Sequence, residues 1–158
     1  MGIATVRGLS VSLGLPARGV CTLDALAAGI REGTEGPALA VLDGWRGEVF
    51  AALYDNAGDR LWEPAVYRPE ALAERVAELR ESPLAAGSGA LRFRAELARG
   101  DVRIADDSDP VHRVAARHVC ALAAAAAVEE DRDGLAPIYL RPPDAERWRE
   151  RDAFRENR

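Results

Sequence analysis

The spacing of apolar residues divides the chain into helical and extended segments. Near the N-terminus, apolar residues recur every three or four positions, which predicts an amphipathic helix that ends at Gly14 and Pro16. The same spacing predicts a second helix, with Thr22 as its expected N-cap and Gly33 as its end. The continuous apolar run 38–43 then predicts a strand that is buried on both faces.

Further along, extended and helical patterns alternate. Segments 48–55 and 60–68 are bounded by turn residues, so they predict two more strands joined to the first by hairpins. The remaining pattern predicts a helix at 69–80, a strand and turn at 83–90, a short helix at 91–98, a strand at 102–105, a long helix at 107–130 and an extended segment at 136–146. This mixture of strands and helices is typical of an α/β domain.

Composition and charge narrow the class of protein. A chain of 158 residues with a net charge of −5 suits one domain and argues against a surface that grips a phosphate backbone unaided. All 21 basic residues are arginines, which we interpret as the codon bias of a GC-rich gene. Cys21 and Cys120 have no companion ligands and suit reduced thiols. No apolar stretch approaches a membrane span of about 20 residues, so we expect a cytoplasmic protein.

The first hairpin carries three charged side chains that could form an active site. Asp43, Arg46 and Glu48 lie within six residues, and two carboxylates beside a guanidinium can perform acid–base chemistry. The structural interpretation is that Asp43 accepts hydrogen bonds from the turn, while Arg46 pairs with Glu48 across the hairpin. Because no histidine, nucleophile or metal cluster accompanies them, the structural interpretation is favoured.

Other candidate sites are weak. The segment "AAGSGAL" (85–91) resembles a phosphate loop but lacks its lysine, so close packing of a strand on a helix explains the glycines better. His112 and His118 lie six positions apart on the expected long helix, about 240° around its axis, and are interpreted as structural. The sequence therefore predicts no catalytic residue, no cofactor and no metal site.

Three blocks together resemble one family. They are "GIATVRGLSVSLGLPARGVCTLDALA" (2–27), "AVLDGWRGEVFAALYD" (40–55) and "PIYLRPPDAE" (137–146), in the order and at the spacing found in the TsaB (YeaZ) family. The resemblance covers 2 to about 146. The residues that carry the second and third motifs are Asp43, Arg46, Gly47, Glu48, Tyr139, Leu140 and Arg141.

The resemblance implies an actin-like fold of two ribonuclease-H-like halves, also found in sugar kinases. Here the first half-domain is expected to be largely missing. The implied domains are a remnant at 1–33, a C-terminal half-domain at 38–143 and a charged tail at 144–158. By resemblance, the first helix belongs to a partner interface, with the expected residues Ile3, Val6, Leu9, Ser10 and Leu13.

The resemblance also implies a function. TsaB-like proteins are non-catalytic scaffold or dimerization subunits of the complex that makes threonylcarbamoyladenosine in tRNA. The expected partners are a TsaD-like catalytic subunit, a TsaE-like ATPase and a second copy in a homodimer, with tRNA reached only through the complex. The alternative is a kinase-like or hydrolase enzyme that uses Asp43 and Glu48, and a third reading is a stand-alone interaction module.

Met1 stands where the family pattern "G-L-R-V-G-I-A-T" has valine or isoleucine. The codon GTG encodes valine internally and methionine at a start, and the first helix begins without an N-cap. We therefore expect the native reading frame to continue upstream of Met1.

Overall fold

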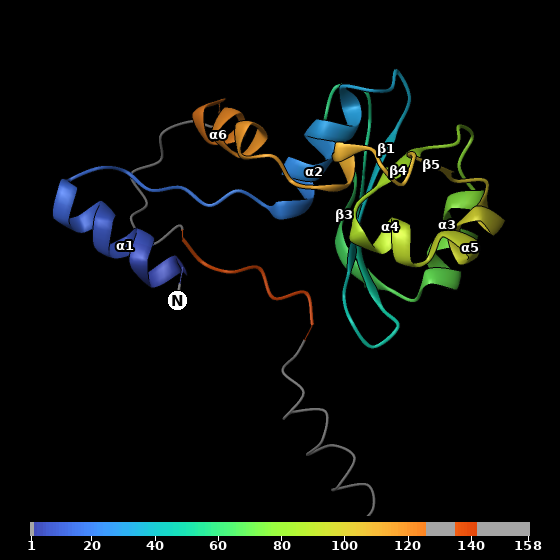
Figure 1. Ribbon diagram of the computed structural model, residues 1–158, viewed down its shortest axis with the longest axis horizontal. Coiled ribbons are helices and arrows are strands. Elements are labelled where there is room, and N and C mark those ends of the chain that lie inside the picture. Colours follow the sequence, from blue (N-terminus) through green and yellow to red (C-terminus); the bar gives the residue numbers. More distant parts are fainter. Residues whose placement is uncertain (1, 126–134, 142–158) are drawn as a thin grey trace, which may run out of the picture.

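A mixed β-sheet forms the centre of the molecule (Figure 1). The computed structural model describes residues 2–125 and 135–141. Within them, the sheet has five strands in the order β3-β2-β1-β4-β5. The first three strands form antiparallel hairpins, whereas β4 and β5 run parallel to β1. The strands are β1 (Ala38–Asp43), β2 (Val49–Tyr54), β3 (Arg60–Tyr67), β4 (Leu84–Ala86) and β5 (Arg103–Ile104).

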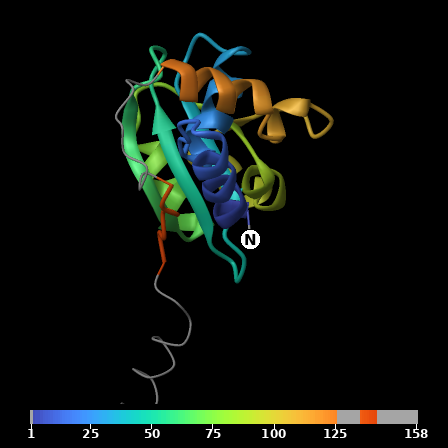
Figure 2. The same ribbon diagram turned by 90° about the vertical axis from the view of Figure 1, so that its left-hand side faces the viewer.

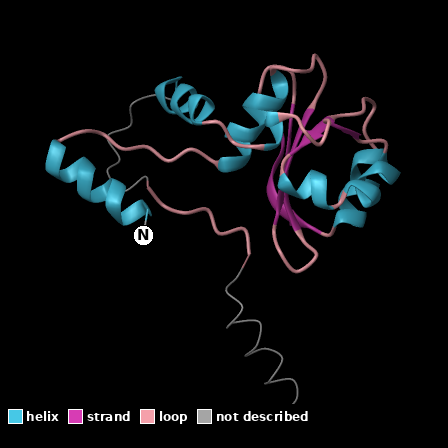
Figure 3. Ribbon diagram, in the orientation of Figure 1, coloured by secondary structure: helices cyan, strands magenta, loops and turns pink. Residues whose placement is uncertain are grey.

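Helices cover the two faces of this sheet (Figure 3). The helices are α1 (Gly2–Leu13), α2 (Thr22–Arg31), α3 (Pro69–Ala77), α4 (Ser88–Arg92), α5 (Arg94–Leu97) and α6 (Ala116–Ala125), with the 3-10 turns η1 (Ala98–Gly100) and η2 (Pro110–His112). One core cluster joins the sheet to α3, α4 and α5, and a second joins the opposite face to α2. The expected α/β class is confirmed.

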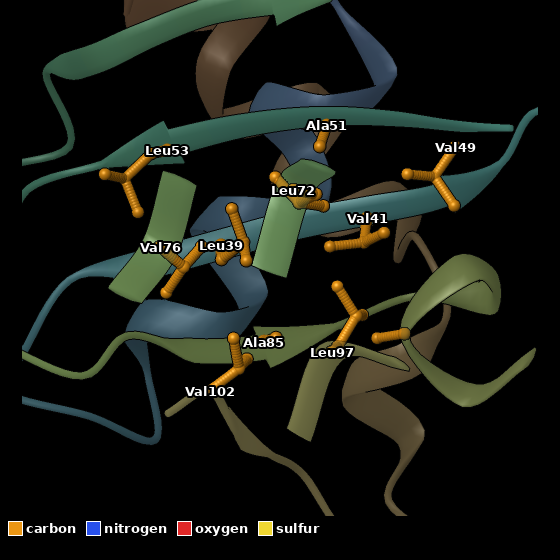
Figure 4. Packing of buried hydrophobic residues seen from close by; sticks show 11 residues of the cluster. Leu39, Val41, Val49, Ala51, Leu53, Leu72, Val76, Ala85, Leu97 and Val102 are labelled. Carbon is orange, nitrogen blue, oxygen red and sulfur yellow. The ribbon is translucent and has the colours of Figure 1, made fainter. Parts of the chain in front are cut away.

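The alternation of side chains along β1 explains why both faces are buried. Leu39 and Val41 point into the cluster shared with α3, where Leu72 packs against the sheet (Figure 4). Ala38 and Ala40 point the other way, and their small side chains leave room for α2. The continuous apolar run therefore predicted β1 correctly.

Two details of the predicted helices were wrong. Cys21 is the N-cap of α2 and Thr22 is its first residue, with no capping hydrogen bond from a side chain. The expected long helix is interrupted after η2, because Arg113 has an extended backbone and α6 begins only at Ala116. The two histidines therefore lie on different elements. Asp109 caps η2, because its side chain accepts a hydrogen bond from the Val111 backbone N–H.

The domain division expected from the resemblance stays a prediction, and the charged tail lies outside the described residues, as do 126–130 of the expected long helix and 142–146 of the expected extended segment. In the part of the chain that the structure describes, no helix combines the length and apolar character that crossing a bilayer requires.

A polar network attaches α2 to the hairpin of β2 and β3. The Tyr54 hydroxyl donates to Asp24 at 2.6 Å, and Arg60 binds the same carboxylate through two nitrogens at 2.9 and 2.7 Å. Burial, together with the hydrogen bond to Asp24, raises the pKa of Tyr54 above its ordinary value. The hydrogen bond to Asp24 likewise raises the pKa of Arg60. The folded state thus holds Tyr54 as the neutral phenol.

The substitution Tyr54→Phe tests this network through its pH dependence. At neutral pH we expect it to lower the free energy of unfolding by about 1–2 kcal/mol, because a hydrogen bond to a carboxylate is lost. The raised pKa means that the contribution of Tyr54 is complete below the unfolded-state pKa of about 10 and is lost as the pH rises above it. Urea unfolding from pH 7 to 11 should therefore show the gap between the two proteins narrowing above pH 10. A constant gap would contradict the assignment.

Candidate functional site

The turn between β1 and β2 has an unusual backbone. Trp45 and Arg46 have φ angles of 60° and 58°, and Gly47 follows at 78°. Left-handed backbone is ordinary for glycine, but for residues with bulky side chains it costs of the order of 1–3 kcal/mol each. The Trp45 side chain gains little burial in return, since it is 71% exposed.

Hydrogen bonds from Asp43 hold this turn. Its carboxylate accepts from the Trp45 backbone at 2.9 Å and pairs with Arg92 at 2.6 Å. The Gly44 backbone N–H donates to the Glu48 carbonyl at 2.9 Å, which closes the hairpin. The predicted role of Asp43 as an acceptor for turn N–H groups is confirmed.

Glu48 has a partner that local sequence reasoning missed. Arg141 donates to the Glu48 carboxylate at 2.8 Å and to the Gly44 carbonyl at 3.2 Å, and both charged side chains are about three-quarters buried, at 22% and 23% exposure. We call this arrangement the Arg141 clasp. It joins two of the motif blocks, 93 positions apart in sequence. The only signal in the sequence was that both residues belong to family motifs.

The chemistry available at this turn is limited by these ion pairs. Asp43 and Glu48 are each paired with an arginine, and Asp43 also accepts a hydrogen bond from the turn backbone, so both carboxylates have structural roles. No group of three or more His, Cys, Asp or Glu side chains close enough to bind a metal ion occurs within residues 2–125 and 135–141. The geometry therefore favours the structural interpretation of the hairpin over the enzymatic one.

The glycine-rich segment after β4 also has a structural explanation. A Cβ atom at Gly87 would lie 2.2 Å from the Val41 carbonyl oxygen, and one at Gly89 would lie 2.8 Å from the carbonyl carbon of Leu42. The Gly87 N–H donates to His112 Nδ1 at 3.0 Å. Close packing, as predicted, accounts for these glycines, and His112 and His118 are both buried.

Helix α1 is the second notable surface. It projects from the rest of the molecule on the extended segment 14–21 and has no buried residue (Figures 1 and 2). Four of the expected interface residues are exposed, from 41% at Ile3 to 63% at Leu13, while Ser10 is half-buried and donates to the Leu15 carbonyl. Val11 and Leu15, which the expectation omitted, are exposed as well. The structure thus brings the predicted residues onto one accessible helix.

A groove lies between α1 and the sheet. Its volume is about 770 Å³, and its lining is mostly apolar. Ile3 contributes from α1, the sheet contributes from β1, β2 and β3, and the segment 135–141 forms another wall. The principal apolar lining residues are Ile3, Leu23, Leu42, Phe50, Pro64 and Leu140. The lining also includes Arg141, so the segment that carries the clasp residue and the first helix face the same groove.

Comparison with known proteins assigns the chain to a family. Residues 1–138 match the family model described as TsaD, tRNA N6-adenosine threonylcarbamoyltransferase. The tRNA threonylcarbamoyladenosine biosynthesis protein TsaB of Escherichia coli is 33% identical over 94 residues, covering 56% of this chain and 41% of that protein. The chain belongs to the family of the matching model, in its TsaB (YeaZ) branch. An uncharacterized Mycobacterium leprae protein, ML0378, is 44% identical over 69 residues, which are 44% of this chain and 18% of that protein.

Solved structures confirm the fold. YeaZ from Pseudomonas aeruginosa has a TM-score of 0.60 at 25% identity and covers 87% of this chain and 66% of its own. A Pseudomonas aeruginosa protein described as similar to the peptidase YEAZ has a TM-score of 0.61 at 24% identity, with 89% and 66% covered. The expected actin-like, ribonuclease-H-like architecture is confirmed. The chain spans about 41% of the E. coli TsaB relative and two-thirds of each solved one.

Proposed function

We propose that the chain acts as a non-catalytic scaffold subunit in the formation of threonylcarbamoyladenosine in tRNA, and that α1 docks onto a TsaD-like catalytic subunit. The observation that carries this proposal is the exposure of α1, which buries none of its residues. Family membership supports the choice of pathway, because the TsaB of E. coli is named for threonylcarbamoyladenosine biosynthesis.

The physical argument begins with the length of α1. A helix of twelve residues is marginal by itself in water, because most helix stability in proteins comes from packing an apolar face. Among the described residues, Arg7 of α1 donates a hydrogen bond to the Leu135 carbonyl at 3.2 Å. The exposed stripe of Ile3, Val6, Leu9 and Leu13 therefore supports a docking role.

We include two further members in the proposed assembly, a TsaE-like ATPase and a second copy of this chain. We place the assembly in the cytoplasm. The net charge of −5 supports contact with tRNA through the catalytic subunit, since an acidic surface repels a phosphate backbone. The two ion-paired carboxylates of the hairpin support a scaffold rather than a kinase-like or hydrolase enzyme.

The double substitution Val6→Asp and Leu9→Asp tests the docking helix. Both side chains are exposed, at 44% and 54%, so the midpoint of thermal unfolding of the free chain should be nearly unchanged. Isothermal titration with the purified TsaD-like subunit of the same organism should show binding that is at least about ten-fold weaker, because charges are placed in an apolar contact.

Ser12→Asp is the matched control, since it adds a charge to the same helix at an exposed polar position. It should retain most of the affinity. Undiminished binding by the double variant would refute α1 as the docking element, and a wild-type chain that neither binds the TsaD-like subunit nor supports tRNA modification in cells would refute the function.

A further inference from the structure

The segment 135–141, which we call the strap, is attached at its two ends. Leu135 is buried, and its carbonyl accepts a hydrogen bond from Arg7 of α1 at 3.2 Å. At the other end, Arg141 forms the clasp with Glu48 at the β1–β2 turn. Figure 1 shows the strap as an extended segment that begins beside α1 and ends beside the sheet. The strap thus has one attachment to the first helix and another to the turn.

Between these ends the strap gains little burial. Residues 136–139 are all exposed, with 62% exposure at Ile138 and 82% at Tyr139, and Leu140 is half-buried. Side chains that remain in solvent contribute little free energy from packing. The clasp is therefore a principal attachment of the second half of the strap, and the buried Leu135 is placed to act as a hinge. All seven residues line the groove, so a strap that swings outward widens it.

The clasp depends on the shape of the turn. One nitrogen of Arg141, Nη1, donates both to the Gly44 carbonyl at 3.2 Å and to the Glu48 carboxylate at 2.8 Å. These two acceptors lie on opposite sides of Trp45 and Arg46, whose backbone is left-handed. Relaxation of the turn to ordinary backbone angles would move the two acceptors relative to each other. The closed clasp therefore requires the strained turn.

Helix α4 holds the other side of the turn, through Asp43. The Asp43 carboxylate pairs with Arg92 at 2.6 Å and accepts from the Trp45 N–H at 2.9 Å. The Asp43 N–H donates to the Ser88 hydroxyl at 3.1 Å. Both Arg92 and Ser88 belong to α4. Asp43 is thus held by α4, and Glu48 is the carboxylate of this turn that receives the strap.

We propose that the strap is a latch on the groove, with Leu135 as its hinge and the Arg141 clasp as its catch, and that strain in the turn opposes its closure. Opening breaks the Arg141 bonds, lets Trp45 and Arg46 relax and widens the groove. Closing restores the left-handed turn, so the strain favours the open state while the ion pair favours the closed one. The latch goes beyond the proposed function, because it is a property of the chain itself and requires no partner.

Chymotrypsin cleavage after Tyr139 measures opening, because a protease cleaves such a segment through its open state. The substitution Glu48→Gln removes the charge of the catch and leaves the cleaved sequence unchanged. Mass spectrometry should show the fragment that ends at Tyr139 appearing at least about five-fold faster than in the wild type. Asp107→Asn is the matched control, because it removes an ion pair with Arg94 that lies outside the groove lining. It should be cleaved at the wild-type rate.

Two substitutions of Trp45 test the link between the turn and the strap. Both asparagine and alanine remove the indole, but asparagine adopts left-handed backbone more easily. Trp45→Asn should therefore be cleaved after Tyr139 about three-fold more slowly than Trp45→Ala. In chains that also carry Arg141→Gln, the two Trp45 variants should be cleaved at equal rates, because the strap no longer bonds to the turn.

Three results would overturn the latch. Equal cleavage of Glu48→Gln and the wild type would mean that the clasp does not hold the strap. Equal cleavage of the two Trp45 variants, or a difference that persists with Arg141→Gln, would mean that the turn does not oppose closure. Cleavage after the buried Tyr54 that rises together with cleavage after Tyr139 would mean that the whole domain unfolds, without a separate opening of the strap.

Discussion

Replacing Gly87 with alanine is expected to lower the free energy of unfolding by about 3–4 kcal/mol. The φ angle of Gly87 is 117°, a conformation that residues with a Cβ atom rarely adopt. The added methyl group would lie 2.2 Å from the Val41 carbonyl oxygen and 2.8 Å from Leu26 Cδ2. Because Val41 is in the central strand and Leu26 is in the helix that packs on it, neither can move without disturbing the core.

Gly8→Ala provides the control for this substitution. Gly8 lies within α1, and a Cβ atom there meets nothing within 4 Å. Alanine favours a helix over glycine by about 1 kcal/mol, so this variant should be as stable as the wild type or slightly more stable. Urea denaturation followed by far-ultraviolet circular dichroism measures both. Equal midpoints for Gly87→Ala and the wild type would show that the strand and helix can separate at this point.

Local pattern predicted much of this fold because burial and turn formation leave a signal in consecutive residues. The continuous apolar run of β1 reflects burial on both faces, and the interruptions by turn residues located β2 and β3. Because the segment 85–91 lacks the lysine of a phosphate loop, its glycines are interpreted as sites where a strand packs closely on a helix. The contacts of Gly87 and Gly89 confirm that interpretation. Periodicity likewise identified α1 and the stripe that it exposes.

Ion pairs between residues that are far apart in the sequence could not be predicted from the sequence. The Glu48–Arg141 pair joins positions 93 apart, and the Asp43–Arg92 pair joins positions 49 apart. Many carboxylates and arginines in a chain with 30% charged residues could pair equally well on composition alone. Only the fold determines which of them meet. The turn conformation was missed for the same reason, since tryptophan and arginine carry no intrinsic signal for left-handed backbone.

The broken long helix illustrates a tertiary interaction that overrides local propensity. Its alanine-rich sequence favours continuous helix, yet the chain leaves helical geometry at Arg113. At this point the His112 side chain is drawn into the core, where Nδ1 accepts from the Gly87 backbone and Nε2 lies 3.0 Å from the Asp106 carbonyl. Two hydrogen bonds from one buried side chain therefore fix the position of η2.

The same geometry makes His112→Ala the second substitution with a large expected effect. Nδ1 accepts from the Gly87 N–H, and the tautomer with its hydrogen on Nε2 can also donate to the Asp106 carbonyl, which lies 3.0 Å away. Alanine leaves the buried Gly87 N–H without its acceptor and opens a cavity of the size of the imidazole. We expect a loss of about 2–4 kcal/mol in the free energy of unfolding.

His118→Ala is the matched control, because His118 is buried to the same degree, at 8% exposure for each residue. Its ring packs against Gly29 of α2, and its Nε2 lies 3.9 Å from Glu32, which is too far for a hydrogen bond. Removing it should cost about half as much as removing His112, since packing is lost but no backbone N–H is left unpaired. Parallel urea titrations give both values, and hydrogen exchange at the Gly87 amide should accelerate only in His112→Ala. Equal losses in the two variants, with the Gly87 amide still protected in both, would mean that burial alone gives His112 its importance.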